Sequence, residues 1–361
     1  MNKGRAMEIK RINLALQGGG AHGAFSWGVL DRLLDEDWLT ISAVSGTSAG
    51  ALNGAALKGG LSRHTGRAGR RAARENLDHL WAQVGQRSDN RLVRWMYSVF
   101  PAPHGLERVT ELFSPAAWLE NLTRIFSPYD YGPFYVNPLG AVLRELPFPD
   151  FSNDRGPQLF VAATNVRTGR IRVFTRAAAT PDAVMASACL PTLFRAVEIC
   201  DPDTGQLEAF WDGGFTGNPA MFPLYDPRLP RDIVIVNINP LLRDGVPRTP
   251  AQIADRVNEV SFNASLMSDL RAINFVKRLF AEDRMRNRSM KNPLVHMILD
   301  DVLMNDLTAR SKLMPAPGLL ARMKLAGQVA ADTFLNDHAD ALNERDTVDL
   351  PALFAGSGVI G

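Results

Sequence analysis

A serine between two glycines is the first feature of the sequence that could do chemistry. The segment Gly46-Thr47-Ser48-Ala49-Gly50 follows a short apolar run and precedes a run of small, helix-forming residues. In this position the pattern G-x-S-x-G predicts a sharp strand-to-helix turn that lifts a nucleophilic hydroxyl above a sheet. The glycines at 46 and 50 leave the space that the turn needs. We therefore predict that Ser48 is a nucleophile, although the bare pattern also occurs in purely structural turns.

A nucleophilic serine needs a base, and Asp212 is the best-placed acid. It follows the apolar run 207–211 and precedes Gly213 and Gly214, so we expect a carboxylate held accessible at the end of a strand. Taken alone, Asp-Gly-Gly is typical of a structural turn. A solvated aspartate has a pKa of about 3.9 and is a poor base near neutrality, so we expect a partly desolvated site.

A glycine-rich loop precedes the serine and could bind negative charge. Gly18, Gly19, Gly20 and Ala21 leave backbone N–H groups unobstructed at the start of a predicted helix, which suits the oxyanion of a tetrahedral intermediate. The spacing to Gly23 also satisfies the dinucleotide pattern G-x-G-x-x-G. A dinucleotide site should have an acid at the end of the second strand, where this chain has the serine turn. Nucleotide binding therefore stays as an alternative only.

Histidine is the usual base for a nucleophilic serine. Only His296 and His338 follow Asp212, as the chain order Ser-Asp-His of α/β-hydrolases requires. His296 falls in a predicted buried strand and His338 in a polar helix near the C-terminus, and Ser48 comes too early for that fold. Both histidines are therefore expected to be structural.

These residues need a scaffold that brings strand ends together. Residues 12–16 and 24–34 predict a strand and a helix, and residues 41–44 and 51–57 repeat the plan. Two consecutive strand–turn–helix units predict a parallel sheet covered by helices. Beyond residue 250 the pattern is mostly helical. Further strands are predicted at 159–163, 171–174, 196–199, 207–211, 233–238 and 294–299, and a further helix at 182–189.

Composition excludes several classes of protein. Among 361 residues, 40 Lys+Arg balance 38 Asp+Glu, so no global field favours a nucleic-acid partner. Cys189 and Cys200 lie in no metal-binding or disulfide pattern, so we expect no metal, no cofactor and a cytoplasmic location. No apolar run reaches the roughly 18 residues of a membrane span.

Residues 61–135 predict an aromatic-rich helical insertion. Its aromatic residues from 81 to 135 fit either the core of a helical subdomain or the mouth or lid of an acyl pocket. Two basic clusters fit either solvated charge or contact with an anionic membrane surface. The first cluster comprises Arg63, Arg67, Arg70, Arg71 and Arg74, and the second comprises Arg284, Arg286, Arg288 and Lys291.

Four sequence blocks, in this order, resemble the patatin-like phospholipases. They are QGGGAHGAF (17–25), GTSAG (46–50), ASACLPTLF (186–194) and DGGFTGNP (212–219). The resemblance implies a three-layer α/β/α fold with a mostly parallel central sheet, and a Ser/Asp dyad without a catalytic histidine. It implies Ser48 as the nucleophile, Asp212 as the base and the backbone amides of the glycine loop as the oxyanion hole. One departure is His22, where many members of the family have arginine.

We therefore predict one patatin-like domain over residues 1–361. Its catalytic core spans about 12–240, with the insertion at about 61–135 and a mostly helical extension over about 250–361. The predicted function is a serine acyl hydrolase of the esterase, lipase or phospholipase A type, acting on lipid or other esters. The alternatives are a nucleotide-binding protein and a catalytically silent regulatory module. The sequence leaves the physiological substrate and the oligomeric state open, and a homodimer is compatible with it.

Overall fold

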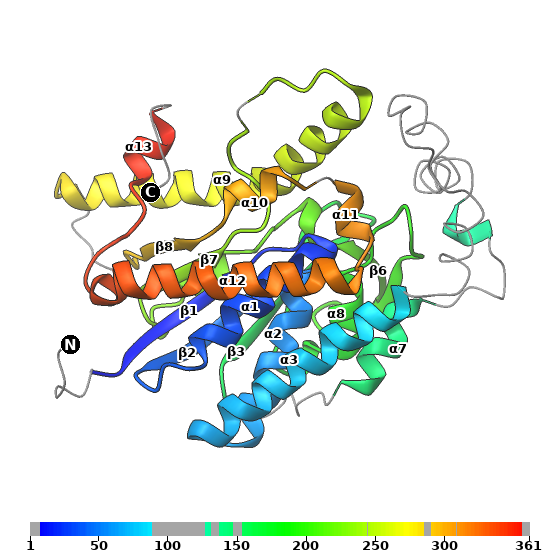
Figure 1. Cartoon of the computed structure of the whole chain (residues 1–361), viewed down its shortest axis with the longest axis horizontal. Coiled ribbons are helices and arrows are strands. Elements are labelled where there is room, and N and C mark those ends of the chain that lie inside the picture. The colour runs from blue at the N-terminus through cyan, green and yellow to red at the C-terminus, as the bar shows by residue number, and fades with distance from the viewer. Residues whose placement is uncertain are drawn as a thin grey trace.

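The computed structural model describes residues 8–88, 127–130, 137–146, 154–243, 245–284, 290–307 and 309–355. Its centre is an eight-stranded sheet (Figure 1). Five parallel strands lie in the order β8-β7-β1-β2-β3. Both β4 and β6 pair with β3 in antiparallel orientation, and β5 pairs antiparallel with β6. The strands are β1 (Lys10–Leu16), β2 (Leu39–Thr47), β3 (Gln158–Asn165), β4 (Ile171–Thr175), β5 (Val197–Cys200), β6 (Leu207–Asp212), β7 (Asp232–Val236) and β8 (Leu294–Ile298).

Helices cover both faces of this sheet. One face packs against α1 (Gly23–Leu33), α2 (Ala49–Arg63), α3 (Gly66–Ser88), α8 (Pro181–Ser187) and α12 (Pro317–His338). The other packs against α9 (Pro250–Ala281) and α13 (Leu350–Phe354) (Figure 1). Shorter helices are α7 (Pro138–Glu145), α10 (Asp301–Asn305) and α11 (Ala309–Leu313). The predicted three-layer α/β/α fold with a mostly parallel sheet is confirmed.

The apolar run of β7 shows why the sheet needs both layers. Successive side chains of a strand point to opposite faces, and Val234 and Val236 join the core under α1 and α12. Ile233 and Ile235 join the core under α9 instead. A strand that is buried on both faces therefore carries a continuous β-branched sequence.

The two longest C-terminal helices have clear sequence causes. The helix α9 begins with a capping box, in which the side chains of Thr249 and Gln252 each accept a hydrogen bond from the backbone N–H of the other residue. It also has proline in its first turn, a position that proline favours. The helix α12 packs its backbone directly against α1. A side chain at Gly28 or at Gly327 would clash with a carbonyl oxygen of the opposite helix, so these glycines permit the close approach.

Part of the predicted insertion belongs to the main core. Leu77, Leu80 and Trp81 of α3 are buried together with residues of α1 and α2. Residues 89–126 and 131–136, which carry most of the aromatic side chains, lie outside the described residues. The interpretation of this segment as a lid also lies outside them.

Most arginines of the first basic cluster form ion pairs or hydrogen bonds within the protein. Arg67 pairs with Asp37, Arg71 pairs with Glu75, and Arg74 pairs with acids of α1 and of the turn that follows. Arg70 donates to three backbone carbonyls at the start of β2. These contacts favour a structural role for the cluster over an open anion-binding surface.

The second basic cluster is also engaged where it is described. Arg284 pairs with Glu282, and Lys291 donates to the carbonyls of Leu224 and Asp226. Residues 285–289 lie outside the described part of the chain.

Candidate functional site

Ser48 lies on a strained turn between β2 and α2. Its backbone has φ 54° and ψ −121°, a conformation that side chains rarely adopt, and such strain is common at functional sites. A side chain at Gly46 would clash with the backbone of Gly50, and one at Gly50 would clash with the carbonyl of Leu16. The two glycines of the pattern are therefore needed because helix and strand meet without space between them. The Ser48 side chain itself is 7% exposed.

The last residue of α8 and the segment that follows contact both predicted catalytic residues. The N–H of Ser48 donates to the Ser187 hydroxyl at 2.8 Å, and that hydroxyl donates to the carbonyl of Ala162 at 2.6 Å. Two residues further on, the carbonyl of Cys189 accepts from the N–H of Asp212 at 2.8 Å. Sequence reasoning assigned no role to Ser187, although the block ASACLPTLF contained it.

The strand register brings the acid to the serine turn. Along one edge of β3, Thr47 of β2 pairs with Ala162, and Asp212 of β6 pairs with the next residue, Ala163. The two strands therefore meet end to end on the same edge. A side chain at Gly213 would clash with the carbonyl of Ala162 and crowd Thr47. This close approach explains why the residue directly after Asp212 is glycine.

Asp212 is fully buried and incompletely bonded. Its Oδ1 accepts from the N–H of Gly214 at 2.7 Å, while its Oδ2 has no hydrogen-bond partner of standard geometry among the described residues. Desolvation raises the pKa of Asp212 to about 7, against smaller lowering contributions from the Gly214 N–H and the Ser48 hydroxyl. The free oxygen and the raised pKa are both properties that a general base at neutral pH requires.

The glycine loop lies against the serine turn. A side chain at Gly18 would clash with Cβ of Ser48 and the carbonyl of Thr47. Gly20 begins a short 3₁₀ turn, Gly20–His22, with φ +59°, which favours glycine. Among the described residues, the N–H groups of Gly19 and Gly20 have no acceptor.

One predicted donor is already used. The N–H of Gly18 donates to Oδ1 of Asn218 at 2.6 Å, so we leave Gly18 out of the proposed oxyanion donors. Asn218 also donates to the carbonyl of Gly18 at 3.3 Å. It belongs to the block DGGFTGNP and ties the loop to the turn that carries Asp212.

His22 is neutral at physiological pH. It is buried, and its Nε2 lies 2.7 Å from the Ser311 hydroxyl. Desolvation, followed by the nearby charge of Lys312, lowers the pKa of His22 to about 3. His22 therefore adds no positive charge beside the glycine loop.

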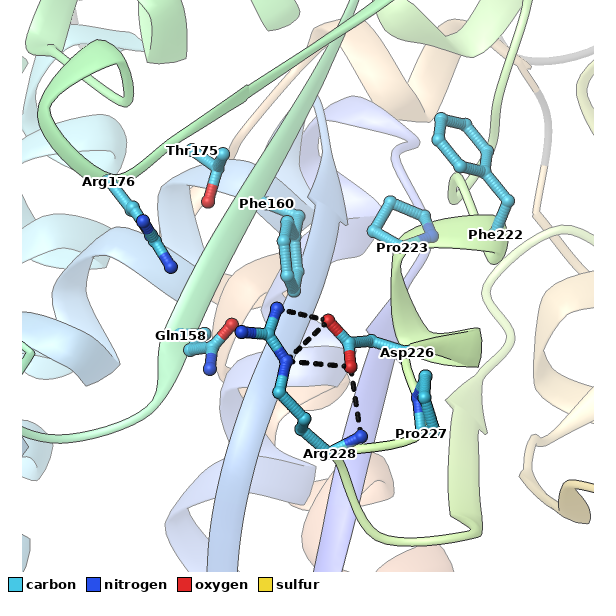
Figure 2. A pocket seen from close by; sticks show the side chains of 9 residues that line it. All are labelled: Gln158, Phe160, Thr175, Arg176, Phe222, Pro223, Asp226, Pro227 and Arg228. Carbon is cyan, nitrogen blue, oxygen red and sulfur yellow. Dashed lines mark hydrogen bonds and ion pairs between the residues drawn. The ribbon is translucent and has the colours of Figure 1, made fainter. Parts of the chain in front are cut away.

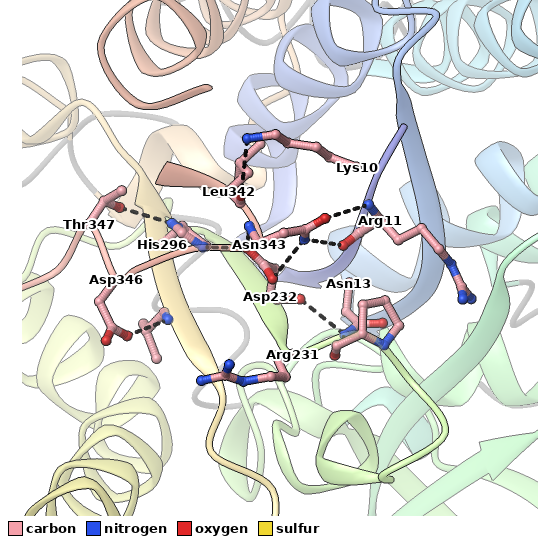
Figure 3. A network of polar contacts seen from close by, with 12 residues as sticks. Lys10, Arg11, Asn13, Arg231, Asp232, His296, Leu342, Asn343, Asp346 and Thr347 are labelled. Carbon is pink, nitrogen blue, oxygen red and sulfur yellow. Dashed lines mark hydrogen bonds and ion pairs between the residues drawn. The ribbon is translucent and has the colours of Figure 1, made fainter. Parts of the chain in front are cut away.

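The remaining candidates lie elsewhere. His296 is fully buried in β8, where its Nε2 contacts Asp232 rather than Ser48 (Figure 3). Burial raises the pKa of the Cys189 thiol to about 12, so this cysteine is not a nucleophile. Among the described residues there is no cluster of potential metal ligands, and none of the described helices is long and apolar enough to cross a membrane.

A surface cavity of about 640 Å³ lies away from these residues (Figure 2). It is lined by Gln158 and Phe160 of β3, by Arg176 after β4, and by the segment from Phe222 to Arg228. Gln158 is at the start of β3, whereas Ser48 follows the end of the neighbouring parallel strand β2. We therefore place the candidate site at the serine turn and not in this cavity.

A family model described as patatin-like phospholipase matches residues 14–225. This range contains the glycine loop, the serine turn and Asp212. None of the curated proteins matches the chain.

Solved structures with low similarity to this chain include VipD and ExoU. VipD from Legionella pneumophila is 17% identical over 94% of this chain and 72% of its own, with a TM-score of 0.39. The type III effector ExoU is 16% identical over 91% of this chain and 53% of its own, with a TM-score of 0.32. ExoU in the heterodimeric ExoU–SpcU complex from Pseudomonas aeruginosa gives 17% identity over 97% and 75%, with a TM-score of 0.27.

Proposed function

Since this chain belongs to the patatin-like phospholipase family, we propose that it is a serine acyl hydrolase that cleaves carboxylic esters of lipids. In this proposal Ser48 is the nucleophile and Asp212 is the only side-chain base. The observation that carries it is the Asp212 carboxyl, which is fully buried and has a pKa raised to about 7. Its Oδ2 has no hydrogen-bond partner of standard geometry among the described residues. A general base works best when its pKa is close to the working pH.

The first half-reaction acylates the serine. Asp212 accepts the Ser48 proton as the hydroxyl oxygen attacks the ester carbonyl, and the N–H groups of Gly19 and Gly20 hold the oxyanion. When the intermediate collapses, protonated Asp212 returns the proton to the departing alcohol. Each oxyanion donor is worth about 10² to 10³ in rate in enzymes of this kind.

The second half-reaction regenerates the enzyme. Asp212 accepts a proton from water as the water attacks the acyl-Ser48 ester, and Ser48 leaves with that proton. Because Asp212 must be ionised in both steps, we expect kcat/KM to rise with pH through about 7.

The two alternatives are less well supported. A nucleotide site would use the N–H groups of the loop at residues 18–23, but that loop faces Ser48 and its first N–H is bonded to Asn218. A catalytically silent module does not need a serine in a strained conformation beside a buried and unsatisfied acid. We propose a lipid ester as the substrate, and the proposal includes no nucleic-acid partner.

The test is turnover of a short p-nitrophenyl ester together with labelling by an organophosphonate. We expect the wild-type protein to hydrolyse the ester and to be labelled at Ser48. Ser48→Ala and Asp212→Asn should each lower kcat by more than about 10³-fold, because each removes one member of a unit that acts together. His296→Ala is the matched control and should keep kcat within a few-fold.

Two outcomes would contradict the proposal. Loss of turnover in folded His296→Ala would restore a histidine mechanism. Failure of the wild-type protein to be labelled or to hydrolyse any ester in a panel of phospholipids, lysophospholipids and neutral lipids would favour the silent module.

A further inference from the structure

Lys312 lies against the glycine loop although it is outside the family match. It belongs to α11, and its carbonyl oxygen packs so closely on Gly20 that a side chain at Gly20 would clash with it. Next to it, the Ser311 hydroxyl contacts His22. The segment after α10 therefore covers the loop that is proposed to hold the oxyanion.

The ammonium group of Lys312 contacts residues on both sides of the candidate site. It donates to Oδ1 of Asn239 at 2.7 Å and to Oδ1 of Asn258 at 3.3 Å. It also lies 5.7 Å from the ring centroid of Phe262, and that ring lies where a side chain at Gly214 would stand. The cation thus contacts residues that support both the glycine loop and the turn after Asp212.

Asn239 connects this cation to a specific peptide group. Its Nδ2 donates to the carbonyl of Gly18 at 3.0 Å, while its Oδ1 accepts from Lys312. The Gly18 carbonyl and the Gly19 N–H belong to the same planar peptide, so a bond that fixes one fixes the direction of the other. Hydrogen bonds in a chain also polarise one another, most strongly when a charge is at the end.

We propose that Lys312 is a positioning residue of the oxyanion hole, which orients and polarises the Gly19 N–H through Asn239 and the Gly18 carbonyl. This role rests on the proposed function, since it assumes that the Gly19 N–H binds an oxyanion. It also identifies the positive charge beside the loop that the neutral His22 does not supply.

The charges around Lys312 determine its protonation. Desolvation lowers the pKa of Lys312 to about 8, Glu259 and Asp255 of α9 raise it, and Arg243 lowers it. His22 faces the same ammonium and is uncharged. The lysine is therefore charged at neutral pH and loses its charge in the range where an alkaline decline of activity can be measured.

The experiment measures kcat and KM for a short p-nitrophenyl ester from pH 6 to pH 10, and phosphonate labelling of Ser48, in the wild type and three variants. In Lys312→Met we expect kcat and the labelling rate to fall about 10-fold or more, with KM within about two-fold, because one oxyanion donor is weakened but not removed. In Lys312→Arg most of kcat should remain, and the decline near pH 8 should move to higher pH because guanidinium stays charged.

Lys324→Met is the matched control. Lys324 is also partly buried, pairs with Asp78 and lies 4.1 Å from the ring centroid of Trp27, so its loss tests the general effect of removing such a cation. We expect its pH profile to match the wild type.

The outcomes separate this proposal from the proposed function. Suppose that the wild-type protein turns over ester and is labelled at Ser48, but Lys312→Met keeps the wild-type kcat and the same decline of kcat at alkaline pH. Lys312 then does not position the oxyanion hole. If the wild-type protein neither turns over ester nor is labelled, the hydrolase proposal itself fails. Should Lys312→Met not fold, an unchanged alkaline limb in Lys312→Arg would be sufficient to reject the role.

Discussion

Two buried aspartates at opposite ends of the sheet have opposite environments. Asp212 is the last residue of β6, beside the Ser48 turn, and Asp232 begins β7 at the other end of the sheet. Among the described residues, Asp212 has one hydrogen bond of standard geometry, to its Oδ1, and its Oδ2 has none. Asp232 accepts from Nε2 of His296 and from the backbone N–H and Nδ2 of Asn343 (Figure 3).

The difference in partners decides the charge state of each acid. Burial alone would raise the pKa of Asp232, but the hydrogen bonds from His296 and Asn343 outweigh it and lower the pKa. With fewer partners, the pKa of Asp212 is raised. Burial of an acid therefore does not by itself indicate catalysis. A buried carboxylate can act as a base near neutral pH when few hydrogen-bond donors stabilise its charge.

The first prediction breaks the Asp232 network. Asp232→Ala should lower the free energy of unfolding by about 3 kcal/mol, because the buried His296 is left without its acceptor and two donors of Asn343 lose theirs. Urea denaturation measures this loss, and kcat per folded molecule should stay within a few-fold of the wild type. A folded Asp232→Ala protein without turnover would contradict the separation of the two acids.

The second prediction uses the raised pKa of Asp212. Between the unfolded pKa, about 3.9, and the folded pKa, about 7, the native state binds more protons than the unfolded state, so stability falls as pH rises. Asp212→Asn should therefore be more stable than the wild type at pH 8, by about 2 kcal/mol, and should gain little at pH 4. Thermal unfolding at both pH values measures the difference. An equal gain at both would show that the carboxyl does not titrate as proposed.

The third prediction concerns the support of the serine turn. Ser187→Ala removes the acceptor of the Ser48 N–H and the donor to Ala162, so we expect about a 10-fold loss of kcat, which corresponds to about 1.4 kcal/mol. The buried Ser62, whose hydroxyl donates to Gly59 within α2, gives a matched control as Ser62→Ala. Equal kcat in the two variants would exclude a role for Ser187 in holding the turn.

Local patterns predicted most of the scaffold. The apolar runs and glycine turns placed the strands from β1 to β8 within a few residues, because periodicity and turn chemistry are local properties. The extension of β2 to Thr47 was not predicted, since the pairing of its last residues with β3 is a long-range contact.

The supporting side chains of the candidate site could not be predicted. Ser187, Asn218, Asn239 and Lys312 contact the serine turn or the glycine loop from distant parts of the sequence. The sequence around a hydroxyl or an amide contains no local pattern that identifies its hydrogen-bond partner. The same reason applies to Gly18, whose N–H is bonded to an asparagine from a later block.

The end-to-end arrangement of β2 and β6 on β3 has a consequence for folding. Ser48 comes from the first part of the chain and Asp212 from a later strand, and they meet only when both strands pair with β3. Such non-local pairing forms late compared with local helices and turns. A nascent or partly folded chain would therefore carry Ser48 without Asp212 beside it, and the proposed ester hydrolysis would begin only once the sheet is complete.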